Sequence, residues 1–407
     1  MSLPSSDVRL TIGGHIAAAF TALVILWAAL ALLSTLLSRL NLAPPSAGLY
    51  IPDPGNGVEA TQTMIRLGSA LSDGRTVVLL GSSELMQTRS FMPYRYLPKE
   101  LGIPVLAIGR GYFQSFAIYE YLSANDRYLS DSTRLVILVS PGWFKEDSIP
   151  FNFFLTYFPA PVLARLLDKD AVTDLMRDYV TAHWSLVEKS SATLSLFGPQ
   201  TNSGAPRQRL WAWIRSGTRR LREQAIGLRE QAFTLRTEFD MLLHTEASNS
   251  HSTIAAINTE TRPVAPDWEA LRRVAQEREL AVMTNNPMYV RDDYYTRYLK
   301  DRGRTEYFPA GMDPKGEMQM LETLLRYLQS RHVHALIVME PLNPYTFSDA
   351  SRARALGNEV AALCASTAMP YYDMTQSDYI PGTLSDAMHV GELGWVLIDE
   401  KIERYYQ

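Results

Sequence analysis

The segment Arg75–Ser90, RTVVLLGSSELMQTRS, decides the fold of this chain because it joins a buried strand to a polar turn. Thr76–Leu80 is a short run of aliphatic and β-branched residues, with Asp73-Gly74 before it and Gly81 after it. A short continuous apolar run between turn residues is typical of a strand that is buried on both faces. We therefore expect a strand of a parallel sheet here, followed by a sharp turn.

The turn after this strand presents two hydroxyl groups, Ser82 and Ser83, followed by Glu84. A serine just beyond the carboxyl end of a parallel strand lies where α/β folds place their ligand sites. If a helix begins here, its free N–H groups can stabilise an oxyanion. The alternative is ordinary helix capping, with one serine as the N-cap and the acidic residue in the first turn.

A second polar element, Ser385–Trp395 (SDAMHVGELGW), favours a catalytic interpretation of the serine turn. Asp386 and His389 are three residues apart, so on a helical turn both side chains lie on one face. A carboxylate there can hold the imidazole tautomer while the other ring nitrogen takes a proton from serine. A D-x-x-H pair alone also fits a simple ion pair. Combined with the strand and its two serines, it predicts a Ser/His/Asp site.

Strands and helices alternate along much of the chain. Further buried strands are predicted at residues 102–108, 134–139, 335–339 and 369–373, and helices at 58–71, 115–129 (amphipathic) and 317–328. This alternation indicates a parallel sheet with helices on both faces. The first three strands end in the loops GSSE, GRGY and SPGW, which in a doubly wound sheet converge on one crevice. We predict one α/β catalytic domain over residues 58–407.

A helical insertion is predicted at about residues 151–280, where the alternation of strand and helix stops. Within it, Arg207–Thr245 carries repeated arginines between apolar positions. That pattern fits either a solvated helix face or a surface beside anionic lipid or an integral membrane partner. The aromatic-rich segment Thr284–Lys300 follows the insertion. Its tyrosines fit either a sugar-binding groove or packed core positions, and they are Tyr289, Tyr294, Tyr295 and Tyr298.

The N-terminal segment Ile16–Leu37 has no charged residue over 22 positions, which is long enough to cross a hydrocarbon core of roughly 30 Å. A signal peptide would have a shorter apolar core and a small-residue cleavage site, whereas Ser38-Arg39-Leu40 follows here. We predict a single-pass transmembrane anchor in residues 1–40 and an extended Pro/Gly-rich linker in 41–57. The alternative is a soluble protein that buries this hydrophobic helix.

Composition excludes several classes of protein. The chain has 407 residues and a formal net charge of −4, which argues against a general nucleic-acid binder. Its single cysteine, Cys364, cannot form an intramolecular disulfide or a Cys-rich zinc site. The sequence contains no Walker loop and no G-x-G-x-x-G motif. We expect chemistry that uses no metal and no nucleotide cofactor.

The chain resembles the SGNH-type hydrolases through its early strand–Ser element, its glycine-bearing second loop and its late D-x-x-H. It is more closely similar to the DltD family, membrane-anchored proteins of teichoic-acid D-alanylation. The resemblance is weak between about residues 151 and 280. The features that carry it are the N-terminal apolar span, GSSEL (81–85), SPGWF (140–144), the Asn-Asn-Pro to Asp-Tyr-Tyr segment (285–295), Pro-Leu-Asn (341–343), DAMHVG (386–391) and Gly-Trp (394–395).

The resemblance implies roles for individual residues. Ser83 falls on the nucleophile, with Ser82 as the fallback, while His389 and Asp386 fall on the base and the acid. Backbone N–H groups of Ser83 and of Gly109 or Gly111 would form the oxyanion hole. The hydrolase pattern expects an asparagine in the third loop, and its absence from SPGW argues against efficient hydrolysis. The remaining candidates for oxyanion or substrate binding are Ser82, Gly109, Gly111, Trp143 and Asn343.

The implied function is an acyltransferase of the cell envelope that moves a D-alanyl or other small acyl group to a glycan or teichoic-acid hydroxyl through a serine acyl-enzyme. The resemblance also implies a DltB-type membrane O-acyltransferase partner, an acyl carrier protein upstream, and a catalytic domain outside the cytoplasmic membrane. Two alternatives stay open from the residues: an SGNH-type esterase or thioesterase that removes acyl groups, and a non-catalytic, membrane-tethered scaffold.

Overall fold

A computed structural model of the chain describes residues 48–52, 57–145, 265–308 and 314–406, together with the isolated positions 21, 22, 25, 162, 310 and 312. Contacts divide the chain into two compact units, residues 1–43 with 227–257 and residues 44–226 with 258–407, and the sheet lies in the second unit. The predicted anchor, Ile16–Leu37, lies outside the described residues apart from Thr21, Ala22 and Ile25. None of the helices that the structure describes is both long enough and apolar enough to cross a bilayer.

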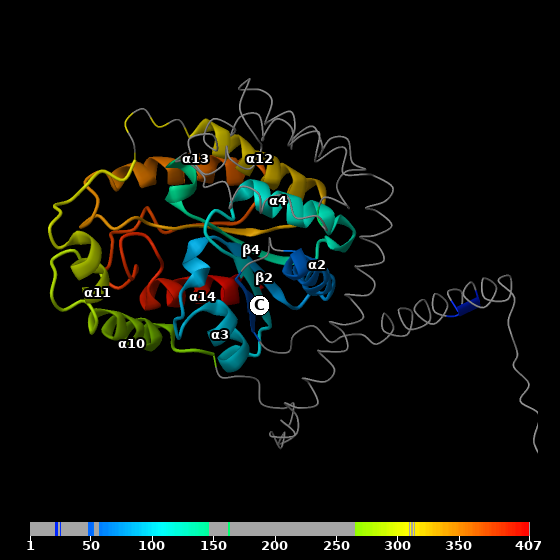
Figure 1. The fold of residues 1–407 in the computed structure, drawn as a ribbon, viewed down its shortest axis with the longest axis horizontal. Helices are drawn as coiled ribbons and strands as arrows, with labels where there is room; N and C mark the ends of the chain where they lie inside the picture. The colour runs from blue at the N-terminus through cyan, green and yellow to red at the C-terminus, as the bar shows by residue number, and fades with distance from the viewer. Residues whose placement is uncertain are drawn as a thin grey trace, which may run out of the picture. The chain divides into compact units, whose positions relative to one another are not determined.

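The described residues form a six-stranded sheet in which every pair of neighbouring strands is parallel, in the order β1-β3-β2-β4-β5-β6 (Figure 1). All residues of β2, β3 and β5 are buried, and so are those of β4 after its first residue. A strand buried on both faces needs apolar side chains at every position, so these segments lack alternation. The bounds are β1 (Leu49–Ile51), β2 (Val77–Gly81), β3 (Val105–Gly109), β4 (Arg134–Val139), β5 (Leu336–Met339) and β6 (Tyr371–Asp373).

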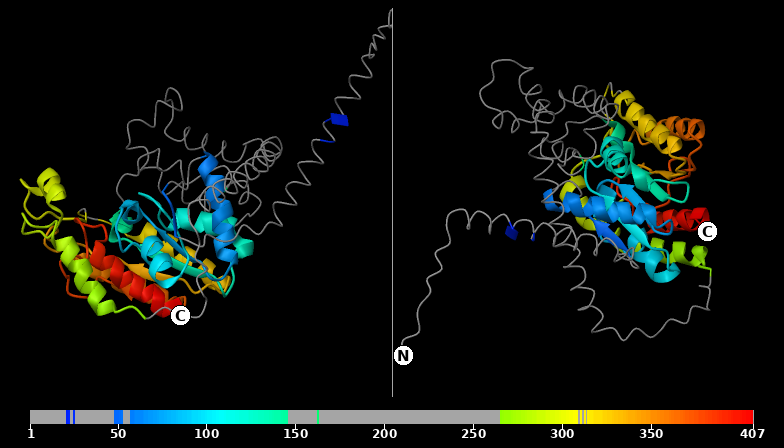
Figure 2. Two further views of the ribbon diagram at one scale, coloured as in Figure 1. Left: turned by 90° about the horizontal axis from the view of Figure 1, so that it is seen from below. Right: turned by 90° about the vertical axis from the view of Figure 1, so that its right-hand side faces the viewer.

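Helices cover both faces of the sheet (Figures 1 and 2). Successive side chains of β2 point into two separate cores, Val78 and Leu80 into one, and Val77 and Leu79 into the other. The first core is closed by α2 (Gly57–Ser72), α4 (Ser115–Ala124), α12 (Lys315–Ser330) and α13 (Ser351–Ser366). The second is closed by α3 (Pro93–Tyr96), α10 (Trp268–Leu280) and α14 (Glu392–Tyr406). The predicted α/β fold with a parallel sheet and helices on both faces is confirmed.

The predicted linker 41–57 contains a strand, which corrects that expectation for residues 49–51. Strand β1 pairs with the edge of β3, with Tyr50 opposite Ala107. The Tyr50 hydroxyl donates to the carbonyl oxygen of Gly109 at 3.0 Å, and its ring stacks on Tyr94 with a centroid distance of 5.3 Å. Three apolar and aromatic residues inside a Pro/Gly-rich segment were enough to pair with an open sheet edge.

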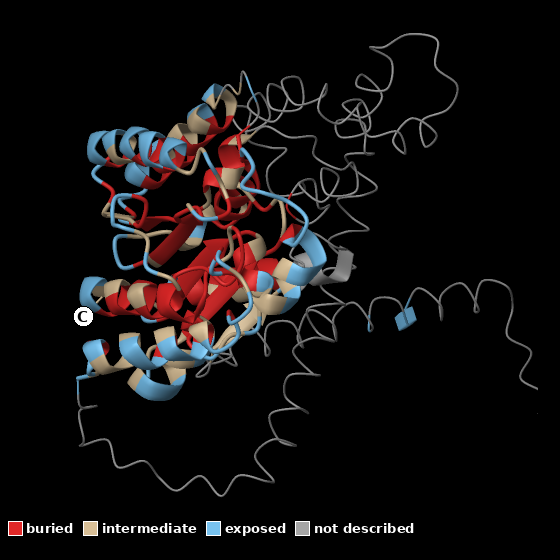
Figure 3. Ribbon diagram, turned by 90° about the vertical axis from the view of Figure 1, so that its left-hand side faces the viewer, coloured by how far each residue is buried: buried red, intermediate tan, exposed pale blue. Residues whose placement is uncertain are grey.

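Helix α4 is not amphipathic as predicted, because every residue from Ser115 to Ser123 is buried. It packs between the sheet and α12, so both of its faces meet protein. Figure 3 shows the strands of the sheet as buried and exposed residues on the outer sides of the helices. The helix also ends earlier than predicted, at Ala124. Asn125 follows, and its side-chain amide donates to the Tyr121 carbonyl oxygen at 2.9 Å, before the short turn η3 (Asp126–Tyr128).

Helix α10 belongs to the helical layer of the sheet, which corrects the end of the predicted insertion at about residue 280. Trp268 donates through its indole N–H to a carboxylate oxygen of Glu403 at 3.1 Å, and Arg272 pairs with Glu400, so α10 is tied along α14. The rest of the predicted insertion, residues 151–264, lies outside the described residues apart from Val162.

Candidate active site

The serine turn sits at the carboxyl end of the central strand β2. Ser83 is the first residue of η1 (Ser83–Met86), a short 3₁₀ helix that begins two residues after Gly81. Gly81 lies opposite Gly109 of β3, and a side chain at either glycine would collide: at Gly109 with the Gly81 backbone, at Gly81 with the Glu84 carboxyl. The absence of both side chains lets the chain turn tightly enough to expose Ser83 directly beside the sheet edge.

Asp386 and His389 lie in a loop rather than on the predicted helical turn, so that expectation was wrong. A bridge between Leu384 and Val390 closes the loop, and the Ser385 N–H donates to the His389 carbonyl oxygen at 2.8 Å. One oxygen of Asp386 accepts the N–H groups of Met388 and His389 at 2.9 and 2.8 Å. Aspartate often folds a backbone turn in this way, and here the turn also brings the two side chains together.

The three predicted side chains Ser83, His389 and Asp386 form a continuous hydrogen-bonded row. His389 Nδ1 is 2.8 Å from the second oxygen of Asp386, and His389 Nε2 is 3.0 Å from Ser83 Oγ. The side chain of His389 is 25% exposed and that of Asp386 11% exposed. A proton on Ser83 can therefore pass to an imidazole whose other nitrogen is held by a carboxylate, at a position that a substrate can reach.

Ser82 has a different environment from its neighbour. It is 5% exposed, and its hydroxyl donates to the carbonyl oxygen of Arg110 at 3.1 Å. Ser83 is partly exposed and faces His389. The side chain of Ser82 therefore ties the β2 turn to the loop after β3, while that of Ser83 is the one within reach of a base.

The electrostatics of this row favour an ionised Asp386 and a more basic His389. Burial disfavours the ionised form of Asp386, but hydrogen bonds from His389 and from the backbone outweigh it and lower the pKa of the carboxyl. Burial likewise disfavours imidazolium at His389, but the hydrogen bond and charge of Asp386, with a contribution from Glu84, raise the pKa of the ring. An aspartate that stays ionised beside a histidine stabilises the positive charge that forms when the ring accepts a proton.

Two further side chains, Gln87 and Glu392, form hydrogen bonds between the segment after Ser83 and the segment around His389. Neither was selected from the sequence. The Gln87 side-chain oxygen accepts a hydrogen bond from the Ser385 hydroxyl at 2.9 Å, and its side-chain N–H donates to Asp386 at 3.4 Å. Farther along, both carboxylate oxygens of Glu392 accept backbone N–H groups, from Ser90 and Phe91, at 3.0 Å each. Gln87 also accepts hydrogen bonds from Arg89 at 3.1 Å, but Ser385 and Asp386 are about three hundred residues away along the chain, so only the fold reveals its contact with them.

Asn343 and Trp143 are buried, whereas we expected them to contact substrate. The Asn343 amide donates to the Met288 carbonyl at 2.9 Å and accepts the Tyr345 N–H at 2.8 Å, while its backbone N–H donates to Ala387 at 3.2 Å. Asn343 therefore holds the Asp386–His389 loop against two neighbouring loops. Trp143 is 4% exposed, lies in η4 (Pro141–Lys145) and packs in the first core.

The two candidate oxyanion glycines differ in their surroundings. Gly109 is the last residue of β3, packed against the Gly81 backbone, and its carbonyl oxygen accepts the Tyr50 hydroxyl. Gly111 lies in the following loop, where an added Cβ would meet no atom within 4 Å. Gly111 is therefore the less crowded of the two candidates.

The predicted tyrosines of 284–300 divide into two groups. Tyr294 and Tyr295, in α11 (Asp292–Tyr294) and η6 (Tyr295–Leu299), pack on a small core of Met288, Val290 and Leu299. Tyr289 is 36% exposed and its ring meets Tyr345, which is 39% exposed, at a centroid distance of 4.7 Å. The segment that carries Tyr289 contacts the Asp386–His389 loop, since the Arg291 N–H donates to the Ser385 carbonyl at 3.0 Å. Tyr298 is 51% exposed and its ring contacts Tyr294.

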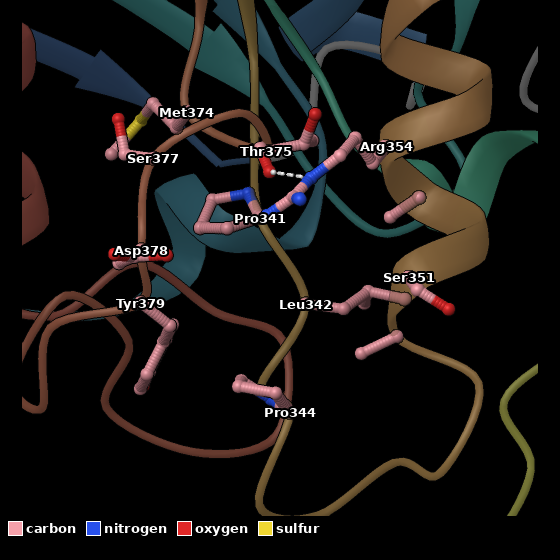
Figure 4. A pocket seen from close by; sticks show the side chains of 12 residues that line it. Pro341, Leu342, Pro344, Ser351, Arg354, Met374, Thr375, Ser377, Asp378 and Tyr379 are labelled. Atoms are coloured by element: carbon pink, nitrogen blue, oxygen red, sulfur yellow. Dashed lines mark hydrogen bonds between the residues drawn. The ribbon is translucent and has the colours of Figure 1, made fainter.

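A cavity of about 270 Å³ opens at the carboxyl ends of β5 and β6 (Figure 4). The Arg354 side chain reaches across it and donates to the Thr375 carbonyl oxygen at 3.3 Å. Ser83, Asp386 and His389 are not among the residues that line it, so this cavity does not hold the reacting atoms. Its lining comprises Pro341, Leu342, Pro344, Ala350, Ser351, Ala353, Arg354, Met374, Thr375, Ser377, Asp378 and Tyr379.

Metal-binding and thiol chemistry find little support in the part of the chain that the structure describes. Within it, no group of three or more His, Cys, Asp and Glu side chains is arranged to hold a metal ion. Cys364 is buried, and burial raises the pKa of its thiol to about 12. The thiolate, which is the nucleophilic and metal-binding form, is therefore scarce at neutral pH.

Comparison with known proteins agrees with the resemblance seen in the sequence. The sequence model of the DltD protein family matches residues 60–407. Protein DltD of Staphylococcus aureus (strain NCTC 8325 / PS 47) is 28% identical over 160 residues, which are 38% of this chain and only 40% of that relative. Protein DltD of Lacticaseibacillus rhamnosus is 22% identical over 348 residues, covering 81% of this chain and 77% of the relative. This chain belongs to the DltD family.

Proposed function

We propose that this protein is a serine acyltransferase of the cell envelope, which carries a D-alanyl or similarly small acyl group on Ser83. The observation that supports this most is the row of side chains in which His389 lies 3.0 Å from Ser83 Oγ and 2.8 Å from Asp386. The D-alanyl group and the envelope setting rest on membership of the DltD family, which the match over residues 60–407 supports.

The first half-reaction loads Ser83. His389 Nε2 takes the Ser83 hydroxyl proton as Oγ attacks the acyl carbonyl of an activated ester or thioester. The bond from carbonyl carbon to the leaving oxygen or sulfur breaks, and the leaving group receives the proton back from His389. Asp386, ionised and bound to Nδ1, stabilises the imidazolium during this exchange. The product is an ester of Ser83.

The second half-reaction hands the acyl group to an acceptor. His389 takes the proton of an acceptor hydroxyl, whose oxygen attacks the Ser83 ester, and the same proton then returns to Ser83 Oγ. Water could attack in the same way, which would make the protein an esterase. The third loop lacks the asparagine of the hydrolase pattern, and its Ser140 hydroxyl accepts the Gly142 N–H at 3.3 Å. We therefore favour transfer to a bound polymer hydroxyl.

The exposed pair Tyr289 and Tyr345 is the proposed contact for the acceptor. Exposed aromatic rings offer flat apolar faces with a polar hydroxyl at the tip, which suits a sugar or polyol chain. The two segments that carry these rings contact the loop of the base, through the Arg291 N–H to the Ser385 carbonyl and the Asn343 N–H to the Ala387 carbonyl. Nearby cations already have partners, since Arg291 pairs with Asp293 at 3.1 Å and Arg304 donates to the carbonyls of Pro344 and Phe347.

The proposed setting is the outer face of the cytoplasmic membrane. Residues 1–40 would anchor the protein through the uncharged segment Ile16–Leu37, residues 41–48 would link this anchor to strand β1, and the catalytic domain with its insertion would run from β1 to residue 407. A DltB-type O-acyltransferase in the same membrane and an upstream carrier protein would supply the acyl group. The acceptor would be a teichoic acid or another envelope glycan.

A serine-directed fluorophosphonate probe tests the proposed nucleophile. Purified full-length wild type, S83A, S82A and H389A would be incubated with the probe and weighed by intact-mass spectrometry. We expect one added probe mass in wild type and S82A, and none in S83A or H389A. Ser82 is the matched control because it is the same residue type one position away. Labelling that survives in S83A, or labelling of no variant at all, would contradict the proposal.

A further inference from the structure

A second carboxyl group, that of Glu84, is buried immediately behind the proposed nucleophile. Glu84 follows Ser83 in η1 and is only 2% exposed. One of its oxygens accepts the backbone N–H of Ser82, in space that exists because Gly81 has no side chain. The carboxyl thus closes the turn that carries Ser83. A neutral acid or an amide could close that turn equally well, so the hydrogen bond alone does not explain a charged residue.

Glu340 is a third carboxyl group in the same region, and it is 1% exposed. It follows β5, and its backbone N–H donates to the Val139 carbonyl oxygen at 3.0 Å. Its Oε1 is buried and finds no hydrogen-bond partner among the described residues, while its other interaction is with Ser140. A buried carboxylate oxygen without a donor is costly, whereas a protonated carboxyl tolerates that environment far better.

The surroundings of the two carboxyls assign the proton to Glu340. Burial raises the pKa of Glu84 to about 7, and the Ser82 N–H and the charge of His389 oppose that rise. Burial raises the pKa of Glu340 well above its ordinary value, and the charge of Glu84 raises it further. The groups that act on Glu84 are thus Glu340, His389 and Tyr50 of β1, whose hydroxyl is bound to a backbone carbonyl.

We infer that Glu84 is a positioning residue that holds the Ser83 turn and supports positive charge on His389, with Glu340 as the protonated partner that leaves the negative charge on Glu84. This rests on the proposed function and deepens it. When His389 takes the Ser83 proton, the imidazolium interacts with Asp386 directly and with Glu84 through the protein interior. Two carboxylates on different segments would then share the stabilisation of one transient cation.

The matched variants E84Q and E340Q separate a charge role from a purely structural one. Both replacements keep the side-chain size, and the amide oxygen in E84Q can still accept the Ser82 N–H. The His389 titration would be followed by NMR in full-length protein with ¹³C-labelled histidine, the signal being assigned with H389N. We expect E84Q to lower the His389 pKa and E340Q not to lower it. An unchanged His389 pKa in E84Q, or a lowered one in E340Q, would overturn the inference.

Infrared spectroscopy gives a second readout, the protonation of Glu340, and needs only the E340Q variant. Glu120 and Asp399 are also buried carboxyls with raised pKa values, so the comparison is a difference spectrum between wild type and E340Q. At neutral pH the wild-type protein should show a protonated-carboxyl band that is missing from E340Q, and identical bands in the two proteins would overturn the assignment. Fluorophosphonate labelling of the same proteins keeps the two hypotheses apart. If wild-type Ser83 is not labelled, the proposed function fails, while the His389 titration still decides whether Glu84 carries charge beside the ring.

Discussion

The serine turn after β2 and the tyrosine segment around Tyr289 both contact the Asp386–His389 region, but they are built in different ways. The turn is packed into the sheet edge, where two glycines and the buried Glu84 fix its path. The tyrosine segment is a loop in which the Asn286 side chain accepts the N–H groups of Met288 and Val290 at 3.2 Å each. The side chain of Tyr289 is partly exposed to solvent. Chemistry needs fixed distances, whereas recognition of a long polymer needs an open surface.

The largest expected effect is a loss of acyl-transfer rate when Asp386, the partner of His389, is changed. D386N keeps an oxygen for the backbone N–H groups of Met388 and His389 but places an N–H donor or a neutral oxygen opposite His389 Nδ1. The ring then loses its tautomer control and its anionic partner, so we expect acyl transfer to fall by about ten thousandfold. Turnover of a D-alanyl thioester measures this. D301N, which changes an exposed carboxylate, should match wild type; equal loss in both variants would contradict the account.

Removing the Asn343 side chain, which ties the tyrosine segment to the loop after β5, should mainly cost stability. N343A deletes the amide that joins the Met288 carbonyl to the Tyr345 N–H and leaves these backbone groups without their partner. We expect a loss of about 2 to 3 kcal/mol in the free energy of unfolding, measured by denaturant titration. N358A is the control, because Asn358 is exposed on α13, and it should change stability by less than about 0.5 kcal/mol. Similar values for the two variants would mean that Asn343 is not a structural link.

A smaller and more selective effect is expected on the recognition side. Y289A removes one exposed ring without touching the row of Ser83, His389 and Asp386, so fluorophosphonate labelling should stay at the wild-type rate. The KM for a polymeric acceptor should rise by about tenfold, which corresponds to about 1.4 kcal/mol of lost contact. Y405A, a partly exposed tyrosine of α14, is the matched control. If labelling falls together with transfer in Y289A, the two regions are not separate in function.

The smallest predicted effect is a shift along the pH axis. His389 must be neutral to accept the Ser83 proton, and its pKa is raised above the ordinary value of 6.5 by Asp386 and Glu84, against the opposing effect of burial. A raised pKa means that the ring begins to protonate at higher pH, so half of the labelling rate should be lost at a pH above 6.5 as the solution is acidified. A rate profile measured from pH 5 to 9 tests this, and a half-loss at or below pH 6.5 would contradict it.

The two regions also differ in how well the sequence predicted them. The segment 134–139 was predicted as a strand with the bounds that β4 has, because uniformly apolar runs can pack only inside a sheet. Ser83, Asp386 and His389 were selected from short motifs, and the fold brings those three side chains together. Local shape was harder to predict: the turn at Asp386 is stabilised by side-chain-to-backbone bonds, and residue spacing cannot separate these from a helical turn.

What the sequence could not predict depends on contacts between distant segments. Strand β1 forms because Leu49–Ile51 pairs with the open edge of β3. The prolines and glycines around these three residues predicted a linker instead of a strand. Tyr345 was not selected, because only the fold brings it against Tyr289. Glu340 was likewise not selected, since nothing in its neighbourhood along the chain indicates a second buried carboxyl near Glu84.

The most direct test of the central claim is to trap the acyl-enzyme. Full-length protein would be mixed with the D-alanyl thioester of a small thiol, quenched in acid after a few seconds, and digested for peptide mass spectrometry. The account predicts one D-alanyl group on the peptide that contains Ser82 and Ser83, fragmentation that places it on Ser83, its retention in S82A and its absence in S83A. D-alanyl transfer to an acceptor by S83A, or an acyl group trapped on any other residue of the wild-type protein, would contradict the claim.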